Sequence, residues 1–482
     1  MARTTPPRRL PVVAAVAVLL LAGGVADRAG RPALPADRGG PPPYRQPTAA
    51  PATAQSSTWY CAGATAAPDG RANGQLRLVN AGADTVTGRV TVVPGEGDAR
   101  SVPVEVPGQG SVDVALADVV SAATAAALVE LDGGQVAVEL TVLGPDGADD
   151  QPCHAGASAE WYVPDGSTAK DATLTLALFN PFPDDAVVDL TFATEEGRVS
   201  PPAFRAVLVP AGRLTTVDVG KQVQRKNEVS TFAVARTGQL VVTALQLFDG
   251  SAGRRDLGLL PAAPATAERW VFPEGYVTDG IIERLSIANP SETETAEVDV
   301  DIVLDEGIAE PVTFEVPPQG RVTFSGNDPA RVPARVGHSL GVRSVNGVGV
   351  VAARTLEAVG SHHRGLAMTL GSRLTAARWL FAAGGPSDGL DHWLVVQNPF
   401  AEPVTVSVTA LADGRLLAVE GLQKVAVGAG RRAAFRLGDH VRRPALPLVV
   451  TATGPVVAER GLYRTGEAVG MSTALGVVLP EE

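Results

Sequence analysis

The chain has 482 residues, of which 45% are hydrophobic and 5% aromatic, and it contains 52 glycines, 38 prolines and 2 cysteines. This length predicts several packed domains, and the many glycines and prolines with few aromatics favour β-sandwiches over helix bundles. Two cysteines exclude a disulfide-dense scaffold, a four-cysteine zinc site and a thiolate-held iron–sulfur cluster, and the net charge of -12 argues against a nucleic-acid-binding protein.

Residues 1–26 have the pattern of an export segment. Three arginines precede an uncharged, apolar run from Leu10 to Ala26, and Asp27 and Arg28 follow it. The run is close to the lower limit of the roughly 17–25 residues that span a bilayer, so a cleaved signal peptide and an uncleaved transmembrane signal anchor both fit. We expect an extracytoplasmic protein, either anchored in the membrane by a single pass or secreted.

Residues 27–58 form the next segment. They combine repeated prolines, including Pro41, Pro42 and Pro43, with Ala, Thr, Arg and Gly and almost no large apolar side chains. This composition predicts a disordered, proline-rich stalk, and a linker without a spacing role is the alternative.

Four of the five tryptophans are nearly periodic: Trp59, Trp161, Trp270 and Trp379, at separations of 102, 109 and 109 residues. A glycine follows each of them four or five residues later, so the spacing indicates an internal repeat. We define repeat 1 as residues 59–160, repeat 2 as 161–269, repeat 3 as 270–378 and repeat 4 as 379–482. Only Trp393 lies outside the series.

An asparagine recurs in each repeat 19 to 21 residues after the tryptophan, at Asn80, Asn180, Asn289 and Asn398. Apolar residues alternate before it, which indicates a strand, and the asparagine begins a turn. A second alternating run and a glycine-marked reversal follow, the latter at Gly110, Gly212, Gly320 and Gly430. Each repeat therefore predicts about six to eight short strands. The tryptophans and asparagines are predicted to be structural anchors.

The fold class predicted from this pattern is all-β, with four tandem immunoglobulin-like β-sandwich repeats after the export helix and the stalk. A row of four sandwiches is the simplest arrangement. A propeller with two sheets per repeat is the alternative.

The repeated openings, such as Trp270-Val271-Phe272-Pro273-Glu274-Gly275, and the segment from Val456 to Tyr463 resemble a family known only as a domain of unknown function (DUF 5719-like). Its members are secreted or membrane-anchored actinobacterial proteins with tandem W-Y-F-A-E-G repeats. The resemblance covers nearly all of residues 59–480 and implies an extracytoplasmic, β-rich, non-enzymatic protein. It supplies no active site.

Cys61 and Cys153 lie near the start and the end of repeat 1. In an exported chain two such cysteines predict a disulfide, and two separate buried thiols are the alternative.

Catalytic and metal-binding patterns are weak. Gly337-His338-Ser339-Leu340-Gly341 matches the G-x-S-x-G pattern of a hydrolase, but no helical pattern follows Ser339 as that elbow requires. The six histidines are scattered, with only His362 and His363 adjacent. We therefore predict no catalytic residue, no metal and no cofactor.

Basic residues recur in one loop of repeats 2, 3 and 4. A stripe that binds an anionic envelope polymer and isolated solvated loops are the two interpretations. The residues are Lys221, Arg225, Lys226, Arg331, Arg335, Arg442 and Arg443.

The function predicted from the sequence is that of a membrane-tethered or secreted scaffold, adhesion or spacer protein of the cell envelope. Cell-wall glycan or another envelope protein is the expected partner, besides the membrane through the N-terminal segment. The alternatives are carbohydrate binding by the repeats, with the tryptophans stacking on sugars, and a serine hydrolase using Ser339.

Overall fold

A computed structural model describes residues 46–276, 280–359, 364–465 and 470–480. Residues Met1–Pro43 and Tyr44–Glu482 are two separate units. The predicted export segment and residues 27–45 of the predicted stalk lie outside the described residues. Within those residues the fold is all-β, as predicted. The helices there are the 3₁₀ turns η1 (Leu116–Asp118), η2 (Pro202–Phe204), η3 (Val219–Lys221) and η4 (Leu437–Asp439). No helix in the described part has the length and hydrophobicity needed to cross a membrane.

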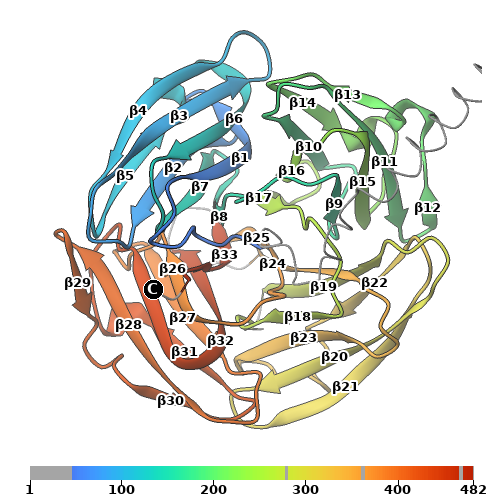
Figure 1. Cartoon of the computed structure of the whole chain (residues 1–482). Coiled ribbons are helices and arrows are strands. Elements are labelled where there is room, and N and C mark those ends of the chain that lie inside the picture. Colours follow the sequence, from blue (N-terminus) through green and yellow to red (C-terminus); the bar gives the residue numbers. More distant parts are fainter. Residues whose placement is uncertain (1–45, 277–279, 360–363, 466–469, 481–482) are drawn as a thin grey trace, which may run out of the picture. The chain divides into compact units, whose positions relative to one another are not determined.

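Strands follow one another along all four repeats (Figure 1). Repeat 1 holds β1 (Ser57–Ala66), β2 (Asn73–Asn80), β3 (Val86–Pro94), β4 (Arg100–Val106), β5 (Gly110–Ala115), β6 (Ala122–Leu131), β7 (Val136–Gly144) and β8 (Gly147–Pro152). Repeat 2 holds β9 (Glu160–Val163), β10 (Ala172–Asn180), β11 (Ala186–Thr194), β12 (Gly197–Val199), β13 (Val207–Val209), β14 (Arg213–Asp218), β15 (Val229–Thr237), β16 (Val241–Asp249) and β17 (Arg255–Pro261).

The second half of the chain continues the pattern. Repeat 3 holds β18 (Arg269–Phe272), β19 (Ile281–Asn289), β20 (Ala296–Leu304), β21 (Ile308–Val316), β22 (Gly320–Ser325), β23 (His338–Ser344), β24 (Val351–Val359) and β25 (Arg364–Leu370). Repeat 4 holds β26 (Ala376–Phe381), β27 (Leu390–Gln397), β28 (Val404–Ala412), β29 (Arg415–Ala418), β30 (Val425–Val427), β31 (Arg432–Arg436), β32 (Leu448–Arg464), β33 (Met471–Leu475) and β34 (Val477–Val478).

Two sheets face each other in repeat 3, with strand orders β18-β23-β20-β21 and β22-β19-β24-β25. The alternation along β20 buries Val298, Val300 and Ile302, which pack in one hydrophobic cluster with Leu285 and Ile287 from the other sheet. Repeat 2 has the same two-sheet plan. In repeat 1 a single parallel pair links the two sheets, and in repeat 4 the long strand β32 belongs to both. Each repeat is thus a two-layer β structure with its own core.

The final antiparallel hairpins bring the four repeats together. Strand β8 contacts β17, β17 contacts β25, β25 contacts β33, and β33 contacts β8 (Figure 1). Gln151 in β8 donates from Nε2 to the carbonyl oxygens of Met368 (3.1 Å) in repeat 3 and Thr473 (2.9 Å) in repeat 4. The expectation of an open row is wrong, because repeat 4 contacts repeat 1 directly and the contacts close into a cycle.

The segment that precedes β1 adds a further link at the junction of repeats 4 and 1. Thr48 pairs in parallel with Val478, and the amide of Ala49 donates to the carbonyl of Val478 (2.9 Å). The carbonyl of Ala50 accepts a hydrogen bond from the amide of Gln135 in repeat 1 (2.8 Å). These residues therefore hydrogen-bond to both neighbouring repeats.

Candidate functional site

A cleft with a cavity volume of about 260 Å³ lies between repeats 3 and 4. Its lining combines aromatic and charged side chains, in contrast to the alanine- and threonine-rich groove between repeats 1 and 2. The residues that give this lining its character are Glu274, Tyr276, Asp305, Asp391, Trp393, Arg432 and Tyr463.

The register of repeat 4 gathers three of these side chains on one surface. Asp391 and Trp393 are two residues apart on β27, so they share a face of the sheet. Tyr463 on β32 is the direct antiparallel partner of Asp391. Cross-strand partners in antiparallel sheets lie side by side, so strand pairing alone places an acid between two aromatic rings.

Hydrogen bonds fix the polar groups of the cleft. Trp393 donates from Nε1 to Oδ2 of Asp391 (3.2 Å), and Arg436 donates from Nε to Oδ1 (2.8 Å). Tyr463 donates its hydroxyl to Oε1 of Glu274 (2.5 Å). Because Glu274 comes from repeat 3, this last bond joins the two walls of the cleft.

Arg432 forms a second connection between the walls. Its side chain is only 2% exposed and pairs with Asp305, whose carboxylate is 50% exposed, while Nη2 lies 3.7 Å from Oε2 of Glu274. The Nε of Arg432 is buried without a hydrogen-bond partner in the described structure. The cleft thus holds an unsatisfied buried donor next to a half-exposed carboxylate.

Beneath the cleft a chain of buried charges crosses the boundary of repeats 3 and 4. His338 Nε2 lies 2.6 Å from Oε2 of Glu283, and Arg354 pairs with Oε1 of Glu459 at 2.6 Å. The other oxygen of Glu459 accepts the amide of Glu274 (2.9 Å). Burying charges this deeply is costly unless each is paired, so the chain of contacts ties the two repeats together.

Protonation in this chain follows from burial and from the neighbouring cations. Burial opposes ionisation of Glu283, yet His338, Arg354 and Arg432 hold the pKa of Glu283 below its usual range. Burial raises the pKa of Glu459 to about 7, although Arg354 acts in the opposite direction. Burial, reinforced by Glu274, also raises the pKa of the Tyr463 hydroxyl well above its usual range, so Tyr463 remains a hydrogen-bond donor.

A similar pair closes the boundary between repeats 4 and 1. Arg460 donates from Nη1 to Oε2 of Glu139 (2.7 Å), and both side chains are fully buried. The carboxylate of Glu139 also accepts the amides of Ala382 (2.7 Å) and Ala383 (3.1 Å). A carboxylate of repeat 1 therefore caps the backbone that follows the tryptophan strand of repeat 4.

The two pairs follow one rule. The strand register aligns Glu139 of repeat 1 with Thr243, Ala353 and Glu459 of repeats 2, 3 and 4. The residues that follow them, Leu140, Ala244, Arg354 and Arg460, are aligned in the same way. An arginine at the second position of one repeat binds the glutamate at the first position of the next repeat. Only the boundaries of repeats 3 with 4 and 4 with 1 have both partners, and the remaining two boundaries lack them.

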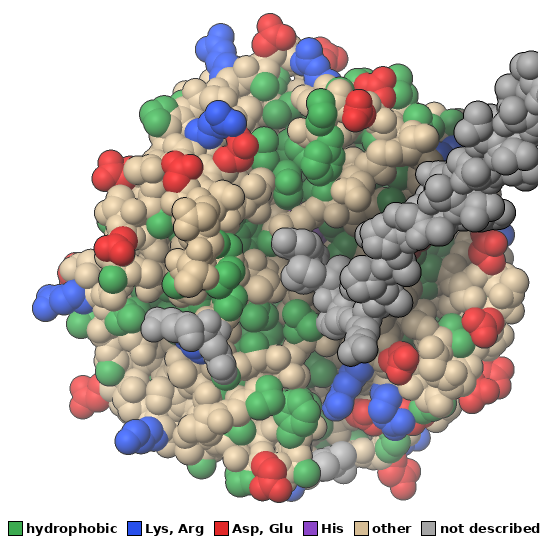
Figure 2. Space-filling view, viewed as in Figure 1, with side chains coloured by type: hydrophobic (Ala, Val, Ile, Leu, Met, Phe, Trp, Pro, Cys, Tyr) green, Lys and Arg blue, Asp and Glu red, His purple; other side chains and the backbone are tan. Residues whose placement is uncertain are grey.

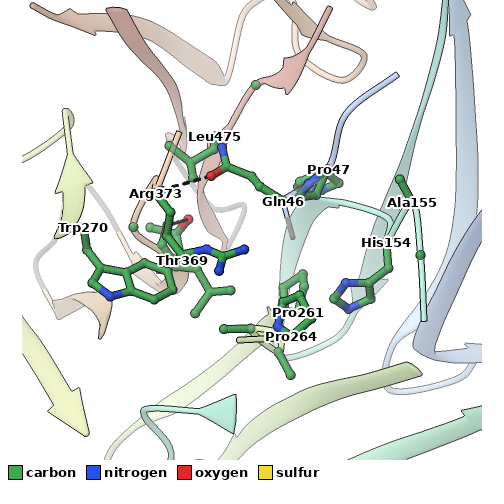
Figure 3. Close-up of a pocket in the computed structure, with 17 residues that line it drawn as sticks. Gln46, Pro47, His154, Ala155, Pro261, Pro264, Trp270, Thr369, Arg373 and Leu475 are labelled. Atoms are coloured by element: carbon green, nitrogen blue, oxygen red, sulfur yellow. Dashed lines mark hydrogen bonds between the residues drawn. The ribbon is translucent and has the colours of Figure 1, made fainter. Parts of the chain in front are cut away.

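A smaller pocket of about 50 Å³ lies where all four repeats meet. Figure 3 shows His154 and Ala155 from repeat 1, Pro261 and Pro264 from repeat 2, Trp270 and Arg373 from repeat 3, and Leu475 from repeat 4 around it. Gln46 reaches in from the N-terminal segment and accepts the amide of Arg373 on Oε1 (3.0 Å). This volume holds a few water molecules at roughly 10–15 Å³ each, so of these two sites the cleft between repeats 3 and 4 is the better candidate for a ligand.

The profile of a family of unknown function, DUF5719, matches residues 48–324, which span repeats 1 and 2 and half of repeat 3. The chain belongs to this family. No curated protein matches the sequence.

Three solved structures are similar to parts of this DUF5719 protein. Thermotoga maritima 1070 is 28% identical, with 22% of this chain and 94% of that chain covered and a TM-score of 0.20. A tetra-tandem repeat from the extending region of a large adhesion protein is 13% identical, with 88% and 99% covered and a TM-score of 0.11. The α-L-rhamnosidase of Streptomyces avermitilis is 10% identical, with 80% and 54% covered and a TM-score of 0.11. TM-scores this low indicate neither a shared fold nor a shared function.

The four periodic tryptophans of the DUF5719 chain, Trp59, Trp161, Trp270 and Trp379, are at most 1% exposed and lie in the repeat cores. Trp270, for example, donates from Nε1 to the carbonyl of Val350 (2.9 Å). Their burial leaves no ring face for a sugar, so stacking by these four residues is wrong as an interpretation. Trp393 alone among the five tryptophans is partly exposed.

The four asparagines make the same three bonds. Each donates from Nδ2 to a carbonyl four or five residues on and to one on the strand beyond the turn, and each accepts on Oδ1 the amide two residues ahead. In repeat 3 the partners of Asn289 are Glu294, Val316 and Ser291; Asn80, Asn180 and Asn398 repeat the pattern.

Cys61 and Cys153 form a disulfide, which ties β1 to the residue after β8. Ser339 is buried on β23 and donates its hydroxyl to the carbonyl of Pro273 (2.6 Å), as Ser230 does to Pro164 (2.6 Å). The described residues contain no group of three or more side chains placed to bind a metal. His362 and His363 lie outside the described residues.

The seven basic loop residues stand in mixed surroundings. Lys221, Arg225, Arg335, Arg442 and Arg443 are exposed, and Lys226 and Arg331 are half-buried. Several of them are paired with carboxylates of their own repeats, among them Lys226 with Glu196, Arg331 with Glu310 and Arg443 with Asp413. Figure 2 shows basic and acidic side chains close together around the face in view. Paired charges attract an anionic polymer less than free ones do.

Sequence reasoning missed the charged residues at the repeat boundaries. Glu274 follows Trp270 by four residues as Asp165 follows Trp161, and Arg432 in β31 and Arg321 in β22 occupy equivalent positions. Arg321 lies 3.5 Å from Asp165, as Arg432 lies 3.7 Å from Glu274. This recurring pair of an acid and an arginine is the sequence signal that could have indicated the boundary residues.

Proposed function

We propose that this protein is a non-enzymatic scaffold or adhesion protein of the actinobacterial cell envelope. In this proposal residues 1–26 export or anchor the chain and residues 27–45 form a stalk, whereas residues 46–58 pack against the repeats. The four repeats, with their W-Y-F-A-E-G-type openings, are immunoglobulin-like sandwiches that work as one body. The Cys61–Cys153 disulfide suits an oxidising, extracytoplasmic compartment.

The observation that carries the proposal is that buried charges are paired between repeats. Arg354, Glu459, Arg460 and Glu139 pair with one another across repeat boundaries. Active sites concentrate perturbed ionisable groups in clefts that a substrate can reach, whereas these four side chains are buried against neighbouring repeats. Such pairing favours a rigid structural role over a catalytic one.

The experiment is a surface-exposure assay on intact cells that produce the full-length protein. Protease added outside the cells should degrade the repeats, and a serine-directed phosphonate should leave the protein unlabelled. Repeats that resist the protease until the cells are lysed would contradict the extracytoplasmic location. Covalent labelling of Ser339 would contradict the non-enzymatic role.

A partner within the envelope is the second part of the proposal. Affinity capture of the exported protein should recover an envelope protein or wall glycan. Binding of an anionic polymer is tested by replacing the seven basic residues with serine and measuring retention on cell wall across a salt series. Unchanged retention would remove that partner class, since phosphate-type contacts weaken with salt.

A further inference from the structure

We propose that the cleft between repeats 3 and 4 binds one neutral sugar unit, with Trp393 as the stacking residue and Asp391 and Asp305 as acceptors of its hydroxyl groups. This inference does not depend on the scaffold proposal, because an envelope scaffold without a sugar site is equally consistent with the buried ion pairs.

Size and chemistry of the lining agree with such a ligand. The volume of about 260 Å³ is just below the roughly 300 Å³ at which pockets for small molecules begin. It accommodates a single pyranose unit. Aromatic rings offer an apolar face to the C–H groups of a sugar ring, and carboxylates accept from its hydroxyls.

The two carboxylates keep acceptor capacity after their internal bonds are counted. A carboxylate has about four lone-pair positions. Asp391 uses one oxygen for Trp393 and the other for Arg436, and Asp305 accepts from Arg432 and from the amide of Gly337 (3.0 Å). Both acids are therefore held in place by donors while positions for further donors remain.

Charge favours a neutral ligand over a cation. Glu274, Asp305 and Asp391 are each in contact with Arg432 or Arg436. Since the arginines already compensate most of the negative charge, an ammonium ion gains little here. Hydroxyl groups, in contrast, satisfy the free acceptors without adding charge.

Only this boundary has the required residues. The position of Trp393, five residues before Asn398, is Gln75, Thr175 and Arg284 in the other repeats. In repeat 3 that residue, Arg284, pairs with Glu357 at 3.3 Å, the residue equivalent to Tyr463. An ion pair thus replaces the aromatic pair, so we expect one sugar site per chain.

Trp393 makes the test direct, because the other four tryptophans are buried. Full-length protein, in a detergent without a sugar headgroup, is titrated with the methyl glycosides of glucose, galactose and N-acetylglucosamine, and tryptophan fluorescence is recorded. At least one glycoside should give a saturable change with a Kd on the order of 1 mM. No saturable change with any of them overturns the proposal.

Ligand-observed NMR on variants locates the site independently of the fluorescence. Trp393→Ala should weaken glycoside binding by about 10-fold or more, and Asp305→Asn, which preserves shape, should weaken it several-fold. Phe400→Ala, which removes an exposed aromatic residue (41% exposed) elsewhere in repeat 4, should bind as the wild type does. Equal binding by all variants, or saturation by choline in place of the glycosides, overturns the proposal.

Discussion

His392 shows how burial at a single residue sets a pH response. Burial, with a further contribution from Arg460, lowers the pKa of His392 to about 3, and its Nδ1 accepts the amide of Gly385 (3.1 Å). Burial likewise lowers the pKa of His154 to about 4. The unfolded chain binds protons on both residues near their ordinary pKa of 6.5. Between these values the unfolded state holds more protons, so both residues make stability fall as the pH falls.

Replacing His392 with asparagine keeps an acceptor for Gly385 and removes the titrating group. We expect the variant to lose less stability than the wild type between about pH 6.5 and pH 4.5, by up to roughly 2–3 kcal/mol. Urea unfolding at a series of pH values measures the difference. Parallel pH profiles for the two proteins would show that His392 contributes nothing.

Asn289 is a second residue whose role can be isolated. Removing its side chain leaves two carbonyls and one amide without their partners. We expect Asn289→Ala to lower the free energy of unfolding by about 3 kcal/mol or more. Asn227→Ala, at an exposed position, should change it by less than about 0.5 kcal/mol. Equal effects of the two substitutions would refute an anchoring role.

At the scale of elements, most strands and turns could be predicted from the alternation of apolar residues and from the turn residues. The buried positions of β20 follow from Val298, Val300 and Ile302 in the sequence. The conformation of the turn before β5, β14, β22 and β31 was harder to predict from the sequence. The residue with left-handed backbone is Gly212 in repeat 2 and Gly430 in repeat 4, but Gln109 in repeat 1 and Gln319 in repeat 3. A glutamine tolerates that conformation when its neighbours impose it. In repeats 1 and 3 the aligned glycines, Gly110 and Gly320, therefore stand one residue after the left-handed position.

The disulfide also acts at the scale of elements, because it links the first strand of repeat 1 to the end of that repeat. The cysteines are 92 residues apart, and closing a loop of that length stabilises the folded state by roughly 4–5 kcal/mol in the chain-entropy treatment. We expect the Cys61→Ala/Cys153→Ala variant to unfold at lower urea concentration than the wild type. A reductant should lower only the wild-type midpoint. Identical midpoints with and without reductant would contradict this role.

At the scale of the molecule, contacts between distant repeats decide the arrangement. Glu139 and Arg460 are 321 residues apart, and nothing in the local pattern around either residue reveals its partner. The same holds for the cleft, because Trp393 and Tyr276 come from different repeats. Sequence periodicity predicted the units, whereas closure depends on pairings that vary from boundary to boundary.

The most direct test of closure is a double-mutant cycle on Glu139 and Arg460. In an open row of repeats these residues would not meet. Because each is buried in the pair, Glu139→Gln and Arg460→Met should each lower the free energy of unfolding by about 3–5 kcal/mol. The exposed pair of Arg89 and Glu130 within repeat 1 is the control and should show a much weaker coupling, because solvent screens it.

Closure predicts that the double variant loses less free energy of unfolding than the two single variants lose together. The difference should exceed about 1 kcal/mol. Effects that add to within about 0.5 kcal/mol would contradict a contact between repeats 4 and 1.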